Sequence, residues 1–339
     1  MIPTLVRLAV RRSLNDTRYI QVVKPRHARG LVREVYRQVE RDFSMIAPPT
    51  ALHSAAPDLL AGSWMILRET LVAQGVAARA SKEAVATGVS VANSCPYCED
   101  VHGMTLAAID ADSQDELTAW AQSSATSAGS GTPPFAPEAA PELIGTAVAF
   151  HYYNRVVNVF LRESPFPSHV PESAKPKARK VLGGVLRPSG QPAKPGDSND
   201  LLPAAPLTDD LTWAVGNEVI ADAFARAYAV ADAAGSRSVP ESVRSLVQTR
   251  LSTWDGSAPG LSRSWAKQAV ADLPEADQPA GHLALVIALA SYQVDEGLIN
   301  AYRETTPGDV PLLELASWAS MAAARRVSTW LTAPTPANP

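Results

Sequence analysis

The sequence contains little cysteine, with two residues among 339. A secreted protein held together by disulfides needs many more, so that class is excluded. Charge is also scarce and nearly balanced, with 19% charged residues and a formal net charge of −4. This balance gives no reason to expect a nucleic-acid partner or binding to an anionic membrane. In a reducing compartment, two closely spaced cysteines are more often catalytic or metal-binding than structural.

The sequence also lacks a long uninterrupted hydrophobic run. Its first twelve residues contain three arginines, which predicts a short amphipathic helix rather than a secretory signal. Residues 143–161 are apolar but include His151, Asn154 and Arg155, and residues 282–294 are too few to cross a bilayer. Both segments are predicted to be buried helices. We therefore expect a cytoplasmic protein without a membrane partner.

Strand signals are nearly absent, since only residues 19–23 (YIQVV) have the necessary density of β-branched residues. Helix signals are frequent, and the fold class is predicted to be all-α. The predicted helices are 57–74, which begins at Pro57 and ends before Gly75; 82–93, capped by Ser81; one that follows a capping box of Ser113 and Glu116; 209–235, capped by Thr208; and 241–254, preceded by Pro240.

Two irregular stretches divide the chain. Residues 122–141 are a predicted loop rich in Ser, Gly and Pro, and residues 163–208 form a predicted proline-rich linker. The expected domains are therefore 1–162, which holds both cysteines, and an all-α domain at 209–334. A basic cluster inside the linker is interpreted as a solvated connector, with an anionic substrate or phosphate contact as the alternative; its residues are Lys175, Lys177, Arg179, Lys180 and Arg187.

A weak internal repeat connects the two halves. Residues 141–161 align without gaps to 311–331, and residues 91–103 align to 289–301. The second copy has Gln293, Glu296 and Asn300 where the first has Cys95, Cys98 and His102. One interpretation is a tandem pseudo-repeat whose second half has lost its chemistry. The alternative is coincidence between two helical patterns.

The cysteines lie in the stretch NSCPYCEDVHG at residues 93–103. Pro96 suits the first turn of a helix, and that helix would place Cys95, Cys98 and His102 on one face. Only the thiolate is nucleophilic, and a helix N-terminus or a neighbouring His⁺ lowers a cysteine pKa from about 8.5 to roughly 3.5–7.5. Cys95 is nearer the helix start and Cys98 is one turn from His102, so the residues alone leave the nucleophile open.

A structural disulfide and a metal site are the alternatives to redox chemistry. Closing a loop of about four residues contributes only about 2 kcal/mol, against about 4.7 kcal/mol for 100 residues, which disfavours a structural disulfide. A zinc site needs four ligands, and no further cysteine exists. The residues that would have to complete it occupy no recognisable motif; they are His53, His151, His169 and Glu83. Redox chemistry is therefore favoured.

Glu83, Cys95, Cys98 and His102 together form the pattern E-x11-C-x-x-C-x3-H. This pattern resembles the signature of alkylhydroperoxidase AhpD-like proteins, in the carboxymuconolactone decarboxylase superfamily. The resemblance extends over about residues 45–162, and the flanking segments are similar to that family's supporting helices. It implies an AhpD-like all-α fold. Taken alone, Glu83 would be a solvated residue in the first turn of its helix.

The resemblance also implies a function and roles for these residues. Cys98 would be the peroxidatic thiol, activated by a proton relay through His102 and Glu83. Its sulfenic acid would condense with Cys95, and an external dithiol, a lipoyl group or a thioredoxin-type protein, would reduce the disulfide. No bound cofactor or metal is expected. Decarboxylase members generally lack the cysteine pair, which disfavours that reaction here.

The chain departs from the family in two respects. Tyr97 stands where some peroxidase members have a histidine, and the chain is about twice the length of a minimal member. The resemblance implies a homo-oligomer. The alternative is that the second half of this chain replaces a neighbouring subunit, which would leave fewer subunits or a monomer. The alternatives to a peroxidase are a non-catalytic redox-sensing or interaction protein and a metal-binding protein. Large residues near the motif are most simply core or interface residues, and the alternative is that some of them form the wall of an apolar substrate channel; they are Trp64, Met65, Trp120, His151, Tyr152 and Tyr153.

Overall fold

The structure is a computed structural model that describes residues 14, 16–43, 45–109, 114–129, 131–166, 172–186 and 192–331. The expected helix at the N-terminus lies outside the described residues, as do Ser113, His169 and Arg187. Within these ranges the chain is helical and contains no strand, only an isolated bridge between Ala73 and Ala193. The all-α prediction is confirmed.

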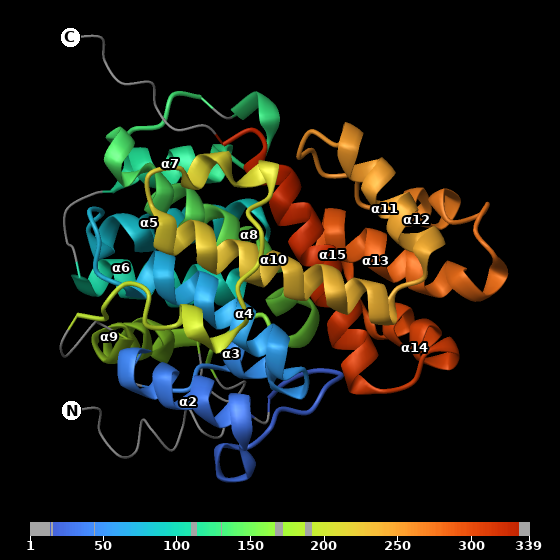
Figure 1. Ribbon diagram of the computed structural model, residues 1–339, viewed down its shortest axis with the longest axis horizontal. Coiled ribbons are helices and arrows are strands. Elements are labelled where there is room, and N and C mark those ends of the chain that lie inside the picture. The colour runs from blue at the N-terminus through green and yellow to red at the C-terminus, as the bar shows by residue number, and fades with distance from the viewer. Residues whose placement is uncertain are drawn as a thin grey trace.

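The first half of the chain surrounds a long central helix, α8 (Figure 1). A π-helical turn, η3, extends α4, and α9 lies within the expected linker. The bounds are α2 Gly30–Phe43, α3 Pro48–Ala51, α4 Pro57–Leu67, η3 Arg68–Val72, α5 Arg79–Ala92, α6 Pro96–Ile109, α7 Asp115–Ser123, α8 Ala140–Phe160 and α9 Lys175–Leu186.

The second half contains two long helices, α10 and α15, with shorter ones beside them (Figure 1). Their bounds are η8 Asp209–Ala214, α10 Glu218–Ser238, α11 Glu241–Thr253, α12 Ser264–Ala269, α13 Gln278–Ala290, η10 Ser291–Gln293, α14 Glu296–Thr305 and α15 Asp309–Ser328. Short 3₁₀ turns complete the described structure at Pro25–His27, Leu52–Ala55, Ser127–Gly129, Pro137–Ala139, Glu172–Ala174, Asn199–Leu201 and Glu275–Asp277.

The two halves share one hydrophobic core. Helix α8 packs against α5 on one side and against α15 on the other, and α4 packs against α10. Nearly every residue of α8 is buried, which explains why its sequence has no polar face. Its polar residues bond to one another and to neighbouring helices, and these contacts reappear in the candidate site.

Two predicted helices end or break earlier than expected. The helix from Pro57 becomes π-helical at Arg68 and stops at Val72, where the N–H of Ala73 closes the wider turn on the carbonyl of Arg68 at 2.7 Å. The helix expected at 209–235 is two elements. Gly216, with φ of +97°, separates them, and Asn217 rather than Thr208 caps α10 through the N–H of Ile220.

Helix α5 begins three residues before the predicted start. Its first residue is Arg79, and Ser81 lies inside the first turn instead of capping it. The N–H of Lys82 bonds the carbonyl of Ala78 at 3.2 Å, and the Arg79 guanidinium pairs with Glu83 one turn later. Glu83 therefore lies in the second turn, and it is fully buried rather than solvated.

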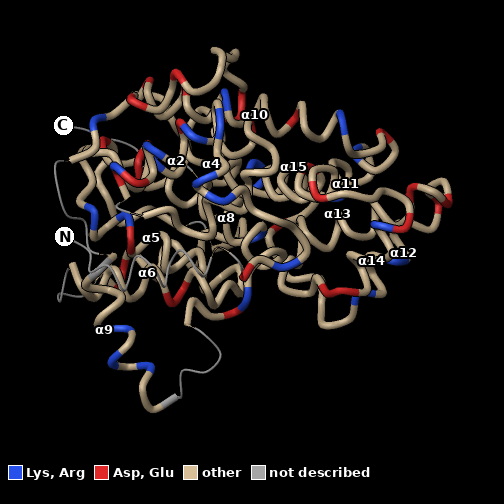
Figure 2. Tube along the Cα trace, turned by 90° about the horizontal axis from the view of Figure 1, so that it is seen from below, with Lys and Arg blue, Asp and Glu red and all other residues tan. Residues whose placement is uncertain are grey.

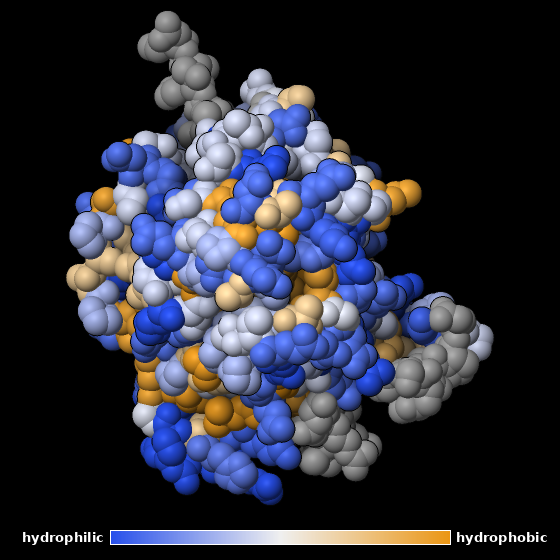
Figure 3. Space-filling model, turned by 90° about the vertical axis from the view of Figure 1, so that its right-hand side faces the viewer, coloured by the Kyte–Doolittle hydropathy of each residue, from blue (hydrophilic) through white to orange (hydrophobic). Residues whose placement is uncertain are grey.

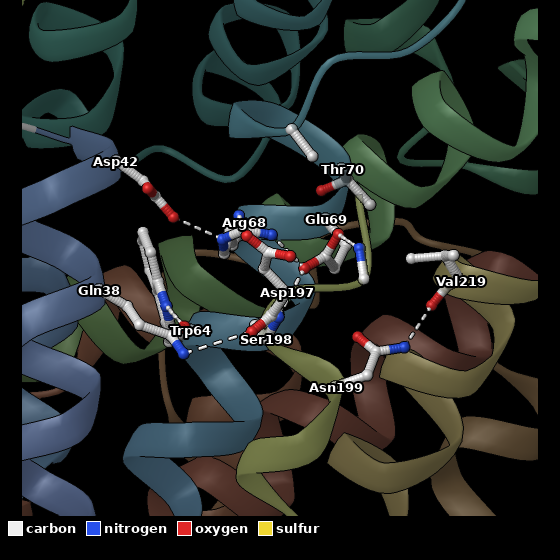
Figure 4. Close-up of polar contacts among 12 residues, drawn as sticks. Gln38, Asp42, Trp64, Arg68, Glu69, Thr70, Asp197, Ser198, Asn199 and Val219 are labelled. Atoms are coloured by element: carbon white, nitrogen blue, oxygen red, sulfur yellow. Dashed lines mark hydrogen bonds and ion pairs between the residues drawn. The ribbon is translucent and has the colours of Figure 1, made fainter. Parts of the chain in front are cut away.

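The end of the expected linker is fixed to the rest of the molecule by a buried polar cluster (Figure 4). Arg68, on the π-helical turn, donates to Asp42 of α2 at 2.6 Å and to Glu69 at 2.5 Å. Glu69 also accepts from the Ser198 hydroxyl at 2.5 Å, and the Asn199 amide donates to the carbonyl of Val219 at 3.0 Å. These bonds hold residues 196–199 between the two halves.

Helix α9 is more than a solvated connector. It packs against α6, and Arg179 forms an ion pair with Asp100 at 2.6 Å. A side chain at Gly183 would meet the carbonyl oxygen of Met104 at 2.6 Å, so the two helices approach closely there. Figure 2 shows α9 at the edge of the molecule with several basic positions, consistent with the exposure of Lys177 and Lys180.

The helices of the second half occur where the proposed repeat places them. Helices α13 and α14 occupy the positions aligned with α5 and α6, and α15 occupies the position aligned with α8. No counterpart of α7 separates α14 from α15. The repeat and the division into domains at 162 and 209 stay predictions.

None of the described helices combines the length and the hydrophobicity needed to cross a bilayer. The face shown in Figure 3 is mostly hydrophilic, with hydrophobic residues between the polar ones. Exposed large apolar side chains, such as Val76, Val215 and Leu261, come from separate segments of the chain.

His53 should make the stability of the fold depend on pH. It is fully buried, accepts from the Tyr152 hydroxyl at 2.8 Å and donates to the carbonyl of Thr50. Burial lowers the pKa of His53 to about 4, so its neutral form is favoured in the folded state. The contribution is complete above pH 6.5 and is lost as pH falls toward 4, at about 1.4 kcal/mol per unit and about 3 kcal/mol in all.

Denaturant titrations between pH 6.5 and 4 measure this effect. His53→Gln should flatten the dependence of the unfolding free energy on pH by about 1.4 kcal/mol per unit. His27→Gln, at an exposed position, is the matched control. Equal slopes in wild type and His53→Gln would contradict the assignment.

Candidate active site

Helix α6 begins at the motif, and its first residue is Pro96. Ser94 adopts a positive φ of 50°, which turns the chain sharply between α5 and α6. The N–H of Cys95 bonds the carbonyl of Ser90 at 2.9 Å, and the Cys95 carbonyl accepts the N–H of Glu99 at 3.0 Å. Cys95 thus stands at the helix start and Cys98 in its first turn, as the sequence predicted.

Both cysteines are free thiols in a nearly closed environment. Cys95 has no exposed surface and Cys98 is 3% exposed. Burial raises the pKa of Cys95, and its hydrogen bond to the Cys98 sulfur raises it further, against smaller lowering contributions from the N–H of Cys98 and the Asn154 side chain. Cys95 therefore keeps its proton and donates it toward Cys98.

Glu83 and His102 are in direct contact. The Nδ1 of His102 lies 2.7 Å from Oε2 of Glu83, and both side chains are buried. Burial raises the pKa of Glu83, but the charge of Arg79 and the contact with His102 outweigh it, so the pKa is lowered overall. The Glu83 carboxylate is ionised at neutral pH. It accepts from Nδ1–H of His102, which leaves Nε2 as the basic nitrogen of the ring.

The surroundings of His102 restrict its orientation. The edge of its ring meets Phe150 of α8, with 4.5 Å between ring centroids. Its side chain keeps 11% of its surface exposed, slightly more than the buried sulfurs. On helix α6 it follows Cys98 by one turn. The ring is therefore held by Glu83 and Phe150 on the side of the helix that carries Cys98.

A network of polar side chains from α8 and from the end of α5 lies beside the cysteines. The Asn154 amide donates to the Ser90 hydroxyl at 3.1 Å and accepts from Asn93 at 3.1 Å. Asn154 is also the residue whose side chain contacts the Cys95 sulfur. Asn93 bonds His151 at 3.0 Å. The start of α6 is thereby tied to the central helix.

The large residues expected in the core are buried. Trp64 and Met65 have no exposed surface, and neither does His151. Tyr97 and Tyr153 both lie near Cys98. Burial is the main cause that raises the pKa of both tyrosines, and the nearby Cys98 raises it further. Tyr97 and Tyr153 therefore contribute neutral, apolar ring surface beside the thiols. Trp120 and Tyr152 are also buried.

The residues considered as metal ligands do not assemble. His53 bonds Tyr152 and Thr50, His151 bonds Asn93, and Glu83 bonds His102 and Arg79. In the ranges that the structure describes, no three His, Cys, Asp or Glu side chains lie close enough to hold a metal ion. The donor set for a zinc site at the cysteine pair is therefore incomplete there.

Two functional contacts were missed by sequence reasoning. Arg79 precedes Glu83 by one helical turn, but the predicted helix began at residue 82 and excluded it. Asn154 was noted only as a polar interruption of an apolar segment. A buried helix that carries Asn154 and Arg155 in succession was the available signal, because buried polar side chains require partners.

Comparisons with known proteins show the family of this chain. The family model described as "Carboxymuconolactone decarboxylase family" matches residues 58–132, which include Glu83, both cysteines and His102. A Mycobacterium tuberculosis protein named alkyl hydroperoxide reductase is 35% identical over 334 residues, which cover 92% of this chain and 94% of that protein. The chain therefore belongs to the AhpD-like proteins of the carboxymuconolactone decarboxylase superfamily.

Proposed function

We propose that this protein is a thiol-dependent peroxidase that reduces alkyl hydroperoxides through Cys98. The observation that carries the proposal is the 2.7 Å contact between Glu83 and His102, one helical turn from Cys98. A general base needs an orienting partner and reach to the proton that it accepts. The name of the M. tuberculosis relative supports the choice of substrate class.

The reaction begins at the cysteine pair. His102 Nε2 accepts the Cys98 proton, directly or through a water molecule, and the resulting imidazolium is stabilised by the Glu83 carboxylate. The Cys98 thiolate attacks the terminal peroxide oxygen and the O–O bond breaks. The sulfur becomes a sulfenic acid, and the alkoxide leaves as an alcohol after taking the proton from His102.

Cys95 completes the oxidative half of the cycle. Its thiol attacks the Cys98 sulfenic acid, forming a Cys95–Cys98 disulfide and releasing water. Burial raises the pKa of Cys95, so Cys95 stays a thiol until the Cys98 sulfenic acid forms, and its proton leaves with the sulfenic hydroxyl as water. An external dithiol, a lipoyl group or a thioredoxin-type protein, then reduces this disulfide by thiol–disulfide exchange and is itself oxidised to a disulfide. No bound cofactor is required.

Burial of both sulfurs favours a second candidate function. With Cys95 fully buried and Cys98 3% exposed, a dithiol has little access to the pair in this conformation. A protein that is oxidised once and reduced slowly would act as a redox sensor rather than as an enzyme. The two functions share their first steps and differ in turnover.

Steady-state peroxide consumption separates the two functions. The protein is mixed with cumene hydroperoxide and excess dihydrolipoamide, and in a parallel series with reduced thioredoxin. A peroxidase should consume many equivalents of peroxide per protein at a constant rate. Consumption that stops after one equivalent, with a disulfide present in the product, would favour redox sensing. In a further series without dithiol, peroxide loss that leaves no Cys95–Cys98 disulfide would contradict both.

A further inference from the structure

Arg155 is a buried cation without a carboxylate partner among the described residues. Its side chain lies on α8, and the residue is 4% exposed. Its Nε donates to the carbonyl of Ala288 at 2.9 Å, and its Nη1 donates to the carbonyl of His151 at 2.7 Å. Burial lowers the pKa of Arg155 to about 10, so the guanidinium is still charged at neutral pH. A buried charge of this kind is costly without a counter-ion.

A cleft adjoins this guanidinium. Its cavity volume is about 50 Å³, and it opens to solvent. Its walls come from both halves of the chain and include Asn93, Arg155, Trp254, Gly256, Ala258 and Tyr292. Ala258 and Tyr292 are exposed, so a small molecule can enter from solvent. The indole of Trp254 lies against the guanidinium, with 5.8 Å from Cζ to the ring centroid.

The repeat supplies an internal comparison for Arg155. The aligned residue is Arg325 of α15, which lies over the Tyr228 ring at 4.5 Å. Its guanidinium is fully partnered by acids, with Asp210 at 2.6 Å and Asp232 at 3.0 Å. Each arginine thus lies against an aromatic ring at the contact between the halves. One faces two carboxylates of the chain, and the other faces a cleft.

Nearby carboxylates do not supply the missing charge. Asp255 precedes Gly256 on the cleft wall, but its carboxylate accepts the N–H of Ser257 at 2.9 Å. Asp295, which follows the η10 turn, is paired with Arg263 at 2.7 Å. Arg155 itself forms no ion pair with any described residue.

We propose that this cleft binds the carboxylate of a small organic acid, which pairs with Arg155 as Asp210 and Asp232 pair with Arg325. A guanidinium receives carboxylate and phosphate alike with two parallel hydrogen bonds. The carboxylates that meet Arg325, and the apolar surface that Trp254 and Ala258 offer to the rest of the molecule, favour a carboxylate. The inference does not depend on peroxidase activity. The site is separate from Cys98, although Asn93 lines the cleft and also contacts Asn154 behind Cys95.

Titration calorimetry with sodium propanoate tests the proposal, against sodium chloride at equal ionic strength and against inorganic phosphate. Wild type should bind propanoate saturably, and its unfolding temperature should rise with propanoate and not with chloride. Ala258→Asp places a carboxylate on the cleft wall and should weaken propanoate binding at least about tenfold, equivalent to about 1.4 kcal/mol. Ala258→Asn, of equal size without the charge, should keep the binding.

A second variant covers the case in which the carboxylate introduced at position 258 does not reach the guanidinium. Arg155→Met removes the cation while keeping a long apolar side chain, and its circular dichroism shows whether it folds. Propanoate binding should disappear in a folded Arg155→Met protein. Saturable binding that survives in folded Arg155→Met, or none in wild type, would overturn the proposal. Binding of phosphate in preference to propanoate would overturn the assignment to a carboxylate.

Discussion

Cys98→Ser should abolish dithiol-dependent peroxide consumption. Serine cannot form a sulfenic acid, and its hydroxyl is a far weaker nucleophile than a thiolate at neutral pH. The loss should be at least about a thousandfold, a small share of the usual enzymatic rate enhancement. The measurement is steady-state consumption of cumene hydroperoxide with dihydrolipoamide. The fold should survive, because Cys98 is a small residue in the first turn of α6.

Cys95→Ser is the matched control for the assignment of the two sulfurs. It should also lose turnover, but it should react once with peroxide and accumulate a Cys98 sulfenic acid, detectable by mass spectrometry after dimedone trapping. Cys98→Ser should form no such adduct. The opposite result, a trapped sulfenic acid at Cys95 and none at Cys98, would exchange the roles of the two cysteines.

Glu83→Gln should lower the rate of the peroxide step by about 10²–10⁴-fold, because Glu83 orients His102 and a general base usually contributes a factor of this size. The amide has the size of the carboxylate but not its charge, so it cannot stabilise the imidazolium of His102 or fix its tautomer. The lowered pKa of Glu83 means that wild type keeps this carboxylate ionised throughout the range above its ordinary pKa of 4.5. The rate of the variant should therefore stay below that of wild type at every pH above 4.5.

Glu142→Gln serves as the control for a merely structural effect. Glu142 is likewise a buried carboxylate paired with a cation, with Lys82 at 2.7 Å, but it contacts backbone N–H groups before α5 rather than His102. Glu142→Gln should lower the unfolding temperature and leave the rate per folded molecule unchanged. If both variants lose the same fraction of activity, or if Glu83→Gln keeps its rate and pH profile, the relay is contradicted.

The fold class followed from sequence because local signals agreed. Apolar residues at helical spacing, with proline at starts, placed α4, α6 and α8 close to their observed positions. Errors arose where tertiary contacts overrode those signals. Ser81 is a good cap, but the pairing of Arg79 with Glu83 extends α5 past it. Glu69 bonds Ser198 and Arg68 pairs with Asp197 at the point where α4 changes into a π-helical turn.

The part of the site that lies on one helix could be predicted from the sequence, and the contacts between helices could not. Cys95, Cys98 and His102 lie on one helix, so their relation follows from its period. The contact of Glu83 with His102 joins two helices and was implied only by family resemblance. Asn154 reaches Cys95 from α8, more than fifty residues later, and no local pattern signals that contact. Helix α9, expected as a connector, covers α6 through contacts that its proline-rich surroundings obscured.

If α8 and α15 are copies in a tandem repeat, as their alignment predicts, their packing joins within one chain two surfaces that a symmetric dimer would form from identical copies. In such a dimer every substitution at the interface appears on both sides of the symmetry axis at once. Here Arg155 and Arg325 belong to one polypeptide, so a change at either position occurs once. A tandem repeat of this kind would let the two sides of the contact diverge, one into the ion pair at Arg325 and the other into the open cleft at Arg155.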